Sequence, residues 1–292
     1  MYYMISKHHK RVLSSIIILL LFSLNLFPQS SDGQVQNNFE REFNNARLVF
    51  HSTCFEKAST LFDLLLKEKQ DHALSFGYAA MIDMLLYRDP SQNIQKARSL
   101  SVETDPEHLF TMALCSFAEG DLLNCELKLK EFLKKYPNST YGMHVLGFTQ
   151  NDSGRPEEGL KTLTVLISRE PAYFPAYNHI GYAYLGLQEK EKALEAFSVF
   201  YDNDSLNPSA LDSLAEGLDA LGNYDGAIAS LSRAVILDPG FAYGWKHMAD
   251  IFKRNGESKL ALNAYGKAKN AAAMYGADFV SAVDKEIKLL KL

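Results

Sequence analysis

The chain has 292 residues, of which 47% are hydrophobic and 22% are charged, and it contains only 9 prolines. This composition can fill the core of one large or two ordinary domains, and it excludes an intrinsically disordered chain. The formal net charge is −5 at pH 7, and the only basic run lies near the N-terminus, so nucleic acid is not expected as a partner.

The first 31 residues have the order of a secretory signal. Lys7, Lys10 and Arg11 precede an apolar run at 12–27, and small polar residues follow it. The run is shorter than the roughly 20 residues that a membrane-spanning helix needs. We therefore interpret 1–31 as a signal peptide or an N-terminal anchor, and no A-x-A site decides between cleavage and anchoring.

Both interpretations place the protein outside the cytoplasm, in the periplasm or elsewhere in the cell envelope, with the apolar run as a means of membrane attachment. Residues 1–31 hold three cations and no acids, so without them the formal charge changes from −5 to −8. Residues 32–38 are expected to be a linker to the folded part of the chain.

The three cysteines, Cys54, Cys115 and Cys125, form no CxxC motif and no disulfide framework. We expect them to be buried small side chains. A bridge between Cys115 and Cys125 is the alternative.

Small residues recur every 34 positions through most of the chain. One series is Ala79, Ala113, Gly147, Gly181, Ala215 and Ala249, and a second, twelve residues later, is Cys125, Gly159, Ala193, Ala227 and Ala261. Each 34-residue unit contains two amphipathic patterns with apolar residues three and four apart, which predicts two helices. Antiparallel helices can approach closely where side chains are small, so these positions are expected to be the helix-packing points.

The unit 208–241 illustrates the pattern. SALDSLAEGLDAL predicts a first helix, which Gly222 ends because glycine adopts the left-handed region without a side-chain clash. YDGAIASLSRAVIL predicts a second helix, which Pro239 closes. Trp245 is expected to belong to the core of the next unit.

These units resemble the tetratricopeptide repeat (TPR). Its pattern of aromatic, large apolar and small residues is matched in 242–275 by Trp245, Met248, Ala249, Phe252, Ala261, Tyr265 and Ala268. Residues 174–207 match it with Tyr177, Ile180, Gly181, Tyr184, Ala193 and Phe197. The resemblance implies an all-α, right-handed superhelical solenoid of tandem helix-turn-helix repeats.

Within that solenoid we expect five in-phase repeats over 106–275 and two divergent repeats over 39–105. Residues 276–292 are expected to form a C-terminal capping helix, because Phe279, Val283, Ile287 and Leu290 make one apolar stripe.

Catalytic and phosphate-binding signatures such as GxSxG, HExxH, GxxxxGK[ST] and GxGxxG are missing from the sequence. His179 and His247 occupy the same repeat position two units apart and are expected to pack beside the core rather than to bind a metal. We therefore expect no enzyme activity, no metal site and no cofactor.

In the family, first-helix residues line the concave groove, where peptides bind. Carried onto this chain, the resemblance implies rows of candidate peptide-binding residues: Phe110, Leu114 and Phe117; His144 and Phe148; Asn178 and Tyr182; Asp212, Glu216 and Asp219; and Lys246 and Lys253. The aromatic and acidic rows would suit an extended or helical peptide with a basic stretch.

Two alternatives remain open for these rows. Phe110, Leu114 and Phe117 could pack beneath the upstream repeats, and the acidic trio could be a solvated face. The carboxylate clamp known from one subset of the family is not matched, because Asp250 stands where that clamp has asparagine.

The sequence thus predicts a non-catalytic scaffold of the cell envelope that binds a protein or peptide of unknown identity. The alternative is a self-associating structural component of an envelope assembly, whose groove is filled by another copy or by its own N-terminal segment.

Overall fold

The computed structural model describes residues 31–291, so the signal or anchor interpretation of 1–31 concerns residues almost wholly outside it. The chain divides into two compact units, 1–41 and 42–292. The first helix, α2 (Ser31–His51), crosses this division. The linker expected at 32–38 is therefore wrong, and no proline or glycine between Gln34 and His51 interrupts the helix.

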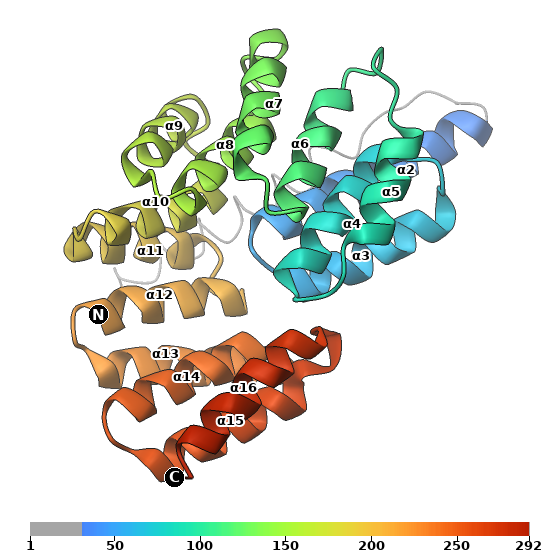
Figure 1. Cartoon of the computed structure of the whole chain (residues 1–292). Coiled ribbons are helices and arrows are strands. Elements are labelled where there is room, and N and C mark those ends of the chain that lie inside the picture. The colour runs from blue at the N-terminus through green and yellow to red at the C-terminus, as the bar shows by residue number, and fades with distance from the viewer. Residues whose placement is uncertain (1–30, 292) are drawn as a thin grey trace, which may run out of the picture. The chain divides into compact units, whose positions relative to one another are not determined.

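The second unit is a succession of antiparallel helix pairs, visible in chain order in Figure 1. The helices that follow α2 are α3 (Phe55–Glu68), α4 (Ala73–Leu85), α5 (Ser91–Leu100), α6 (His108–Ala118), α7 (Leu122–Lys135), α8 (Thr140–Asp152), α9 (Pro156–Arg169), α10 (Pro175–Gly186), α11 (Lys190–Asn203), α12 (Pro208–Ala220), α13 (Tyr224–Leu237), α14 (Ala242–Arg254), α15 (Ser258–Ala271), the short 3-10 helix η1 (Ala272–Met274) and α16 (Ala277–Leu289).

The predicted fold class is confirmed: residues 31–291 form an all-α repeat solenoid without a strand. The small residues of the 34-residue pattern lie where paired helices touch. A Cβ added to Gly147 would lie 2.5 Å from Leu163 Cγ, and one added to Gly181 would lie 2.6 Å from Phe197 Cδ1. Both distances are too short for real contacts, so these helix pairs require glycine at their crossing points.

The turn after each first helix also follows the repeat. Gly120, Gly154, Gly222 and Gly256 have φ between +72° and +78°, and they end α6, α8, α12 and α14. The same position in the repeat between them is Gln188, with φ +61°. The expected role of Gly222 is therefore shared by five consecutive repeats.

The core runs along the solenoid as a series of clusters. One of them joins Ala215, Leu231 and Met248, and the half-buried Trp245 packs against it, as expected. Cys115 and Cys125 are buried and unbridged, and Cys54 is also free. The alternative of a Cys115–Cys125 disulfide is therefore wrong.

Helix α16 packs on α15 and buries Phe279 and Val283. Two ion pairs reinforce this cap, Lys269–Asp284 and Lys253–Glu286. Across residues 31–291 we find no helix with the length and apolarity required to span a bilayer.

The second unit closes on itself, because the turns of its first two hairpins, α2–α3 and α4–α5, contact its C-terminal part. The amide of Gly276 donates to the carbonyl of Leu86 at 2.8 Å, and the ring of Tyr87 packs against Phe279 at 5.8 Å between centroids. On the inner side, Ser209 Oγ donates to the Thr53 carbonyl at 2.8 Å. We call these three pairings the closing contact. It turns the concave surface of the repeats into the wall of a cavity.

Candidate functional site

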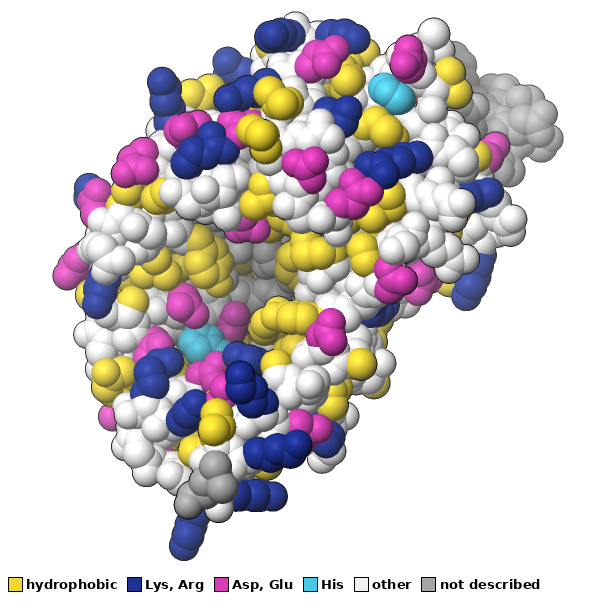
Figure 2. Space-filling model, in the orientation of Figure 1, with side chains coloured by type: hydrophobic (Ala, Val, Ile, Leu, Met, Phe, Trp, Pro, Cys, Tyr) yellow, Lys and Arg dark blue, Asp and Glu magenta, His cyan; other side chains and the backbone are white. Residues whose placement is uncertain are grey.

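A cavity of about 460 Å³ lies within the second unit, at the centre of the curved repeats. This volume falls in the range of small-ligand sites, roughly 300–1,000 Å³. Figure 2 shows a hollow in this face of the molecule, with acidic side chains and a histidine along its lower side. Its lining comes from the α2–α3 turn and the start of α3, the end of α4, the first helices α8, α10, α12 and α14, and the segment after η1.

Aromatic rings form much of the wall of this cavity. They are Phe55, Phe148, Tyr182, Phe241, Tyr243 and Tyr275. Tyr182 is 38% exposed, and its ring meets Phe197 edge-on at 5.1 Å. Phe148 stacks on Phe117 at 4.9 Å. The rings are thus fixed by the core behind them while they present apolar surface to the cavity.

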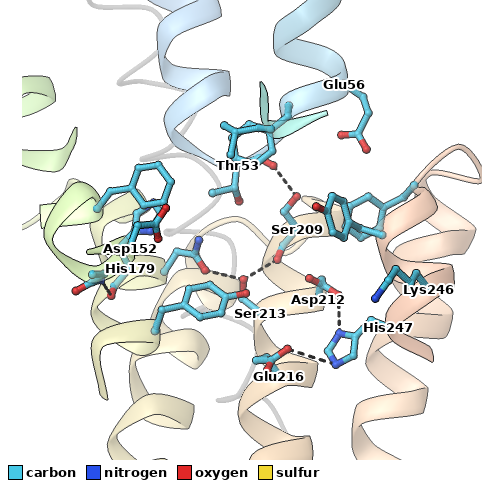
Figure 3. Close-up of a pocket in the computed structure, with 18 of the residues that line it drawn as sticks. Thr53, Glu56, Asp152, His179, Ser209, Asp212, Ser213, Glu216, Lys246 and His247 are labelled. Carbon is cyan, nitrogen blue, oxygen red and sulfur yellow. Dashed lines mark hydrogen bonds and ion pairs between the residues drawn. The ribbon is translucent and has the colours of Figure 1, made fainter. Parts of the chain in front are cut away.

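A histidine held by two carboxylates lies on the floor of the cavity (Figure 3). His247 Nδ1 is 2.8 Å from Asp212 Oδ1, and its Nε2 is 3.4 Å from Glu216 Oε2. Burial lowers the pKa of the imidazole, but the hydrogen bond to Asp212 and the charges of both carboxylates outweigh it and raise the pKa to about 9. His247 is therefore a cation at neutral pH.

A second ion pair flanks the first. Lys246 Nζ donates to Asp250 Oδ2 at 2.8 Å, and the hydroxyl of Tyr265 donates to the other oxygen of Asp250. Both members of this pair are therefore engaged, and neither is left to act as an isolated charge in the cavity.

Two further carboxylates face the cavity without a cation beside them. Glu56 accepts a hydrogen bond from the hydroxyl of Tyr275, and burial raises the pKa of its carboxyl. Asp152 has neither a hydrogen-bonding nor an ionic side-chain partner among the described residues, and desolvation raises its pKa to about 6. Ionisation of either group therefore costs free energy that a positive charge nearby would offset.

One segment of the chain matches a known protein family. Residues 174–198 match the family model of the tetratricopeptide repeat. The chain therefore contains a tetratricopeptide repeat, in agreement with the predicted family. No curated protein matches this TPR chain in sequence.

Solved structures share the TPR fold. TTC0263, a thermophilic TPR protein of Thermus thermophilus, is 20% identical, with 62% of this chain and 98% of that one covered at a TM-score of 0.57. The human IFIT1 dimer with PPP-AAAA is 16% identical, with 81% and 59% covered at a TM-score of 0.62. MamA from Desulfovibrio magneticus RS-1, 17% identical with 57% and 94% covered, has a TM-score of 0.47, too low to support an argument. At these identities the likeness shows the fold alone.

About half of the groove residues expected from the TPR resemblance line the cavity. They are Phe148, Asn178, Tyr182, Asp212, Glu216 and Lys246. Asn178 accepts a hydrogen bond from the Ser213 hydroxyl at 2.6 Å, which fixes its amide at the cavity wall. Whether these residues bind a peptide remains a prediction.

The groove positions expected at the first in-phase repeat are wrong. Phe110, Leu114 and Phe117 are buried, because the preceding first helix α4 packs against α6. Phe110, for example, meets Tyr78 of α4 edge-on at 6.0 Å between centroids. The alternative that these three side chains pack beneath the upstream repeats is the arrangement observed.

His144 is also buried rather than open to the groove. Its Nδ1 lies 2.9 Å from His51 Nδ1 and 2.8 Å from the Tyr173 hydroxyl, so the end of α2 covers it. Asp219 and Lys253 lie outside the cavity lining, each in an ion pair, with Arg254 and Glu286 respectively.

Some lining residues were missed by the sequence analysis. Thr53, Phe55 and Glu56 reach the cavity only through the closing contact, for which the repeat pattern contains no signal. His247 could have been found, since Asp212 lies 35 residues earlier and thus on the adjacent first helix. Within residues 31–291 no group of three or more His, Cys, Asp or Glu side chains could hold a metal ion.

Proposed function

We propose that this TPR protein is a non-catalytic scaffold that binds a segment of another protein in the central cavity. The observation that carries the proposal is the lining itself, in which partly exposed aromatic rings stand beside carboxylates. TPR proteins are in general non-catalytic interaction scaffolds. Exposed aromatic surface next to fixed polar groups is typical of such interfaces.

The polar groups of the cavity are arranged for binding rather than for nucleophilic catalysis. Ser213, His247 and Asp212 are residue types of a catalytic triad. However, His247 directs both ring nitrogens at carboxylates, and the Ser213 hydroxyl bonds to Asn178 and to the Ser209 carbonyl. A protonated histidine cannot accept a proton from a serine, so no activated nucleophile results.

The charge of the lining disfavours nucleic acid as a ligand. Polyanions bind where Lys and Arg neutralise phosphates. Here carboxylates outnumber the two cationic side chains, and both cations are already paired with carboxylates.

We further propose that the scaffold works in the cell envelope. Support comes from residues 1–31, whose basic head and apolar run have the order of a signal peptide or anchor. Fractionation of cells, followed by determination of the mature N-terminus, tests this part. A protein found only in the cytoplasm with residues 1–31 intact would contradict it.

Site-specific photocrosslinking in intact cells tests the binding role. A photoreactive residue replaces Tyr182 in the cavity, and the control replaces Ile236, which is 76% exposed on α13, a helix that does not line the cavity. We expect a distinct protein adduct at Tyr182 and none at Ile236. The same background at both positions would overturn the proposal.

Self-association is the second candidate function, and the same experiment separates it. Adducts at Tyr182 that contain only a second copy of this chain would favour a self-associating envelope component. In that case the mass in solution should also increase with protein concentration.

A further inference from the structure

The cavity has an excess of negative charge. Five carboxylates line it, those of Glu56, Asp152, Asp212, Glu216 and Asp250, and the cationic side chains in the lining are Lys246 and His247. Lys246 pairs with Asp250, and His247 is shared by Asp212 and Glu216. The protein thus supplies too few cations for the carboxylates that it places there.

Two carboxylates without a cation, and a third that shares His247 with Asp212, surround the cavity rather than forming one cluster. Glu56 comes from the start of α3, Asp152 from the end of α8 and Glu216 from α12, and Figure 3 shows them on three different sides. Burial raises the pKa of each of the three carboxyl groups. Asp152 and Glu216 keep some contact with water, and a positive charge between the three groups would stabilise all of their ionised forms.

The aromatic wall complements this charge distribution. A cation is attracted to the face of an aromatic ring within about 6 Å, and the interaction strengthens when the site excludes water. Lysine and arginine also carry long apolar stems that pack on apolar surface while the charged head reaches a polar partner. Tyr182, Tyr243 and Phe148 provide such a surface beside the carboxylates.

Other ligand chemistries fit this lining poorly. An anion would face the excess of carboxylates at short range. A neutral apolar group would remove the remaining water from Glu56, Asp152 and Glu216 without bringing a positive charge in its place, which costs free energy for a charged group.

Resting on the proposed function, we infer that the cavity recognises a cationic side chain, the ammonium of lysine or the guanidinium of arginine, presented by an extended peptide. The head lies among Glu56, Asp152 and Glu216, and the stem lies along the aromatic wall. A free organic amine has the same head chemistry, so the test must separate the two sources.

Calorimetric titration of the purified protein with blocked tripeptides tests this inference. The probes are Gly-Lys-Gly and Gly-Arg-Gly, with acetylated and amidated ends, against Gly-Gln-Gly and Gly-Glu-Gly. We expect both basic peptides to bind at least about tenfold more tightly than the neutral or acidic ones, as loss of a charged hydrogen bond would produce. Equal affinity for all four would overturn the inference.

Charge-neutralising variants locate the binding site. Asp152→Asn and Glu216→Gln should each weaken binding of the lysine peptide by about tenfold. Asp225→Asn is the matched control, because it makes the same change of net charge on the exposed first turn of α13, outside the cavity lining. Circular dichroism before titration checks that each variant is folded. An Asp225→Asn effect as large as the other two would place the cation elsewhere and overturn the inference.

Butylamine separates a peptide from a small amine, and the result also separates this inference from the proposed function. If butylamine binds as tightly as the lysine peptide, the cavity recognises a cation as inferred, but the proposed binding of a peptide is contradicted. If a photoreactive residue at position 182 captures a protein partner, but the basic peptides bind no more tightly than the others, the proposed function is supported and the inference about the cation is contradicted.

Discussion

At the scale of single residues, the turn that ends each first helix shows how the repeat uses glycine. Gly154, Gly222 and Gly256 adopt a left-handed conformation, while Gln188 adopts it at the corresponding position with φ +61°. For a residue with a Cβ that conformation costs roughly 1–2 kcal/mol. Gln188 is therefore a locally strained residue within an otherwise regular series.

Replacing Gln188 with glycine should stabilise the protein by about 1 kcal/mol, because relief of the backbone strain exceeds the added entropy of the unfolded chain. The reverse change at the equivalent position, Gly222→Ala, should destabilise it by a similar amount, about 1 kcal/mol. No atom lies within 4 Å of a Cβ placed at Gly222, so the effect of this substitution comes from backbone conformation and not from packing. Urea unfolding measures the change in the free energy of unfolding of each variant. A change of the same sign in both variants would contradict this explanation.

Asp152 provides a prediction about pH. Desolvation raises the pKa of its carboxyl to about 6 in the folded protein, against 3.8 without the surrounding protein. Below pH 3.8 both states bind the proton and the group contributes nothing. As the pH rises from 3.8 through 6 the unfolded state ionises first, so folding loses stability, and the loss is complete above pH 6.

Asp152→Asn should therefore stabilise the protein at pH 7.5 by about 1 kcal/mol, a value reduced from the full shift because the side chain is partly open to solvent. At pH 3.5 the variant and the parent should have the same free energy of unfolding. Urea titrations at the two pH values provide the measurement. An equal gain in the free energy of unfolding at both pH values would show that the effect comes from packing rather than ionisation.

At the scale of helix pairs, close approach depends on glycine at the crossing. A Cβ at Gly181 would overlap the ring of Phe197, so α10 and α11 would have to separate. Gly181→Ala should cost about 1–3 kcal/mol, as overpacking does. Gly266→Ala is the matched control in α15, where no atom lies within 4 Å of the added Cβ, and it should instead stabilise by about 0.5–1 kcal/mol. Thermal melts compare the two, and a neutral Gly181→Ala would refute the packing role.

The junction of α2, α8 and α10 contains three buried histidines, His51, His144 and His179. Burial lowers the pKa of all three, that of His179 to about 4, against 6.5 when solvated. A lowered pKa means that the folded state binds fewer protons than the unfolded state between pH 6.5 and 4. Stability from His179 is therefore full above pH 6.5 and is lost as the pH falls toward 4.

His179→Leu should make the free energy of unfolding less dependent on pH in this window, by up to about 1.4 kcal/mol per pH unit, the contribution of one proton. Urea midpoints at pH 4.5, 5.5 and 6.5 give the slopes for the variant and the parent. An unchanged slope would mean that His179 is already protonated in the folded state.

At the scale of the whole chain, the repeat could be predicted and its closure could not. Helix pairs, glycine turns and small crossing residues are local and recur every 34 residues, so periodicity alone reveals them. Even the pair of Asp212 and His247, 35 residues apart, lies within one residue of that interval. The hydrogen bond between Tyr275 and Glu56, by contrast, joins residues that are 219 apart in the sequence. It depends on the curvature that accumulates over all the repeats between them.

The same accumulation explains why the groove prediction failed at its first row. A concave surface is open only if nothing returns to cover it. In this chain α2 and α4 do so, and they bury His144 and Phe110 while Tyr182 and Asp212, farther along, remain on the cavity wall. A family pattern that describes one repeat cannot say which repeats the ends of the solenoid will cover.

The closing contact can be tested at Gly276. Its φ of −70° suits any residue, but an added Cβ would overlap the carbonyl of Tyr87 and lie 3.0 Å from the Arg88 nitrogen. Gly276→Ala must therefore separate the C-terminal segment from the α4–α5 turn, which removes the Gly276–Leu86 hydrogen bond and should open the cavity on the side of Glu56. We expect the radius of gyration from small-angle X-ray scattering to increase and the lysine tripeptide to bind several-fold more weakly, while the helix content from circular dichroism stays the same.

Gly266→Ala, with no atom near its added Cβ, is the control and should change none of these three quantities. An alanine at 276 that leaves both the radius and the affinity intact would show that the cavity does not depend on closure, and the ligand would then have to be held by the repeats alone.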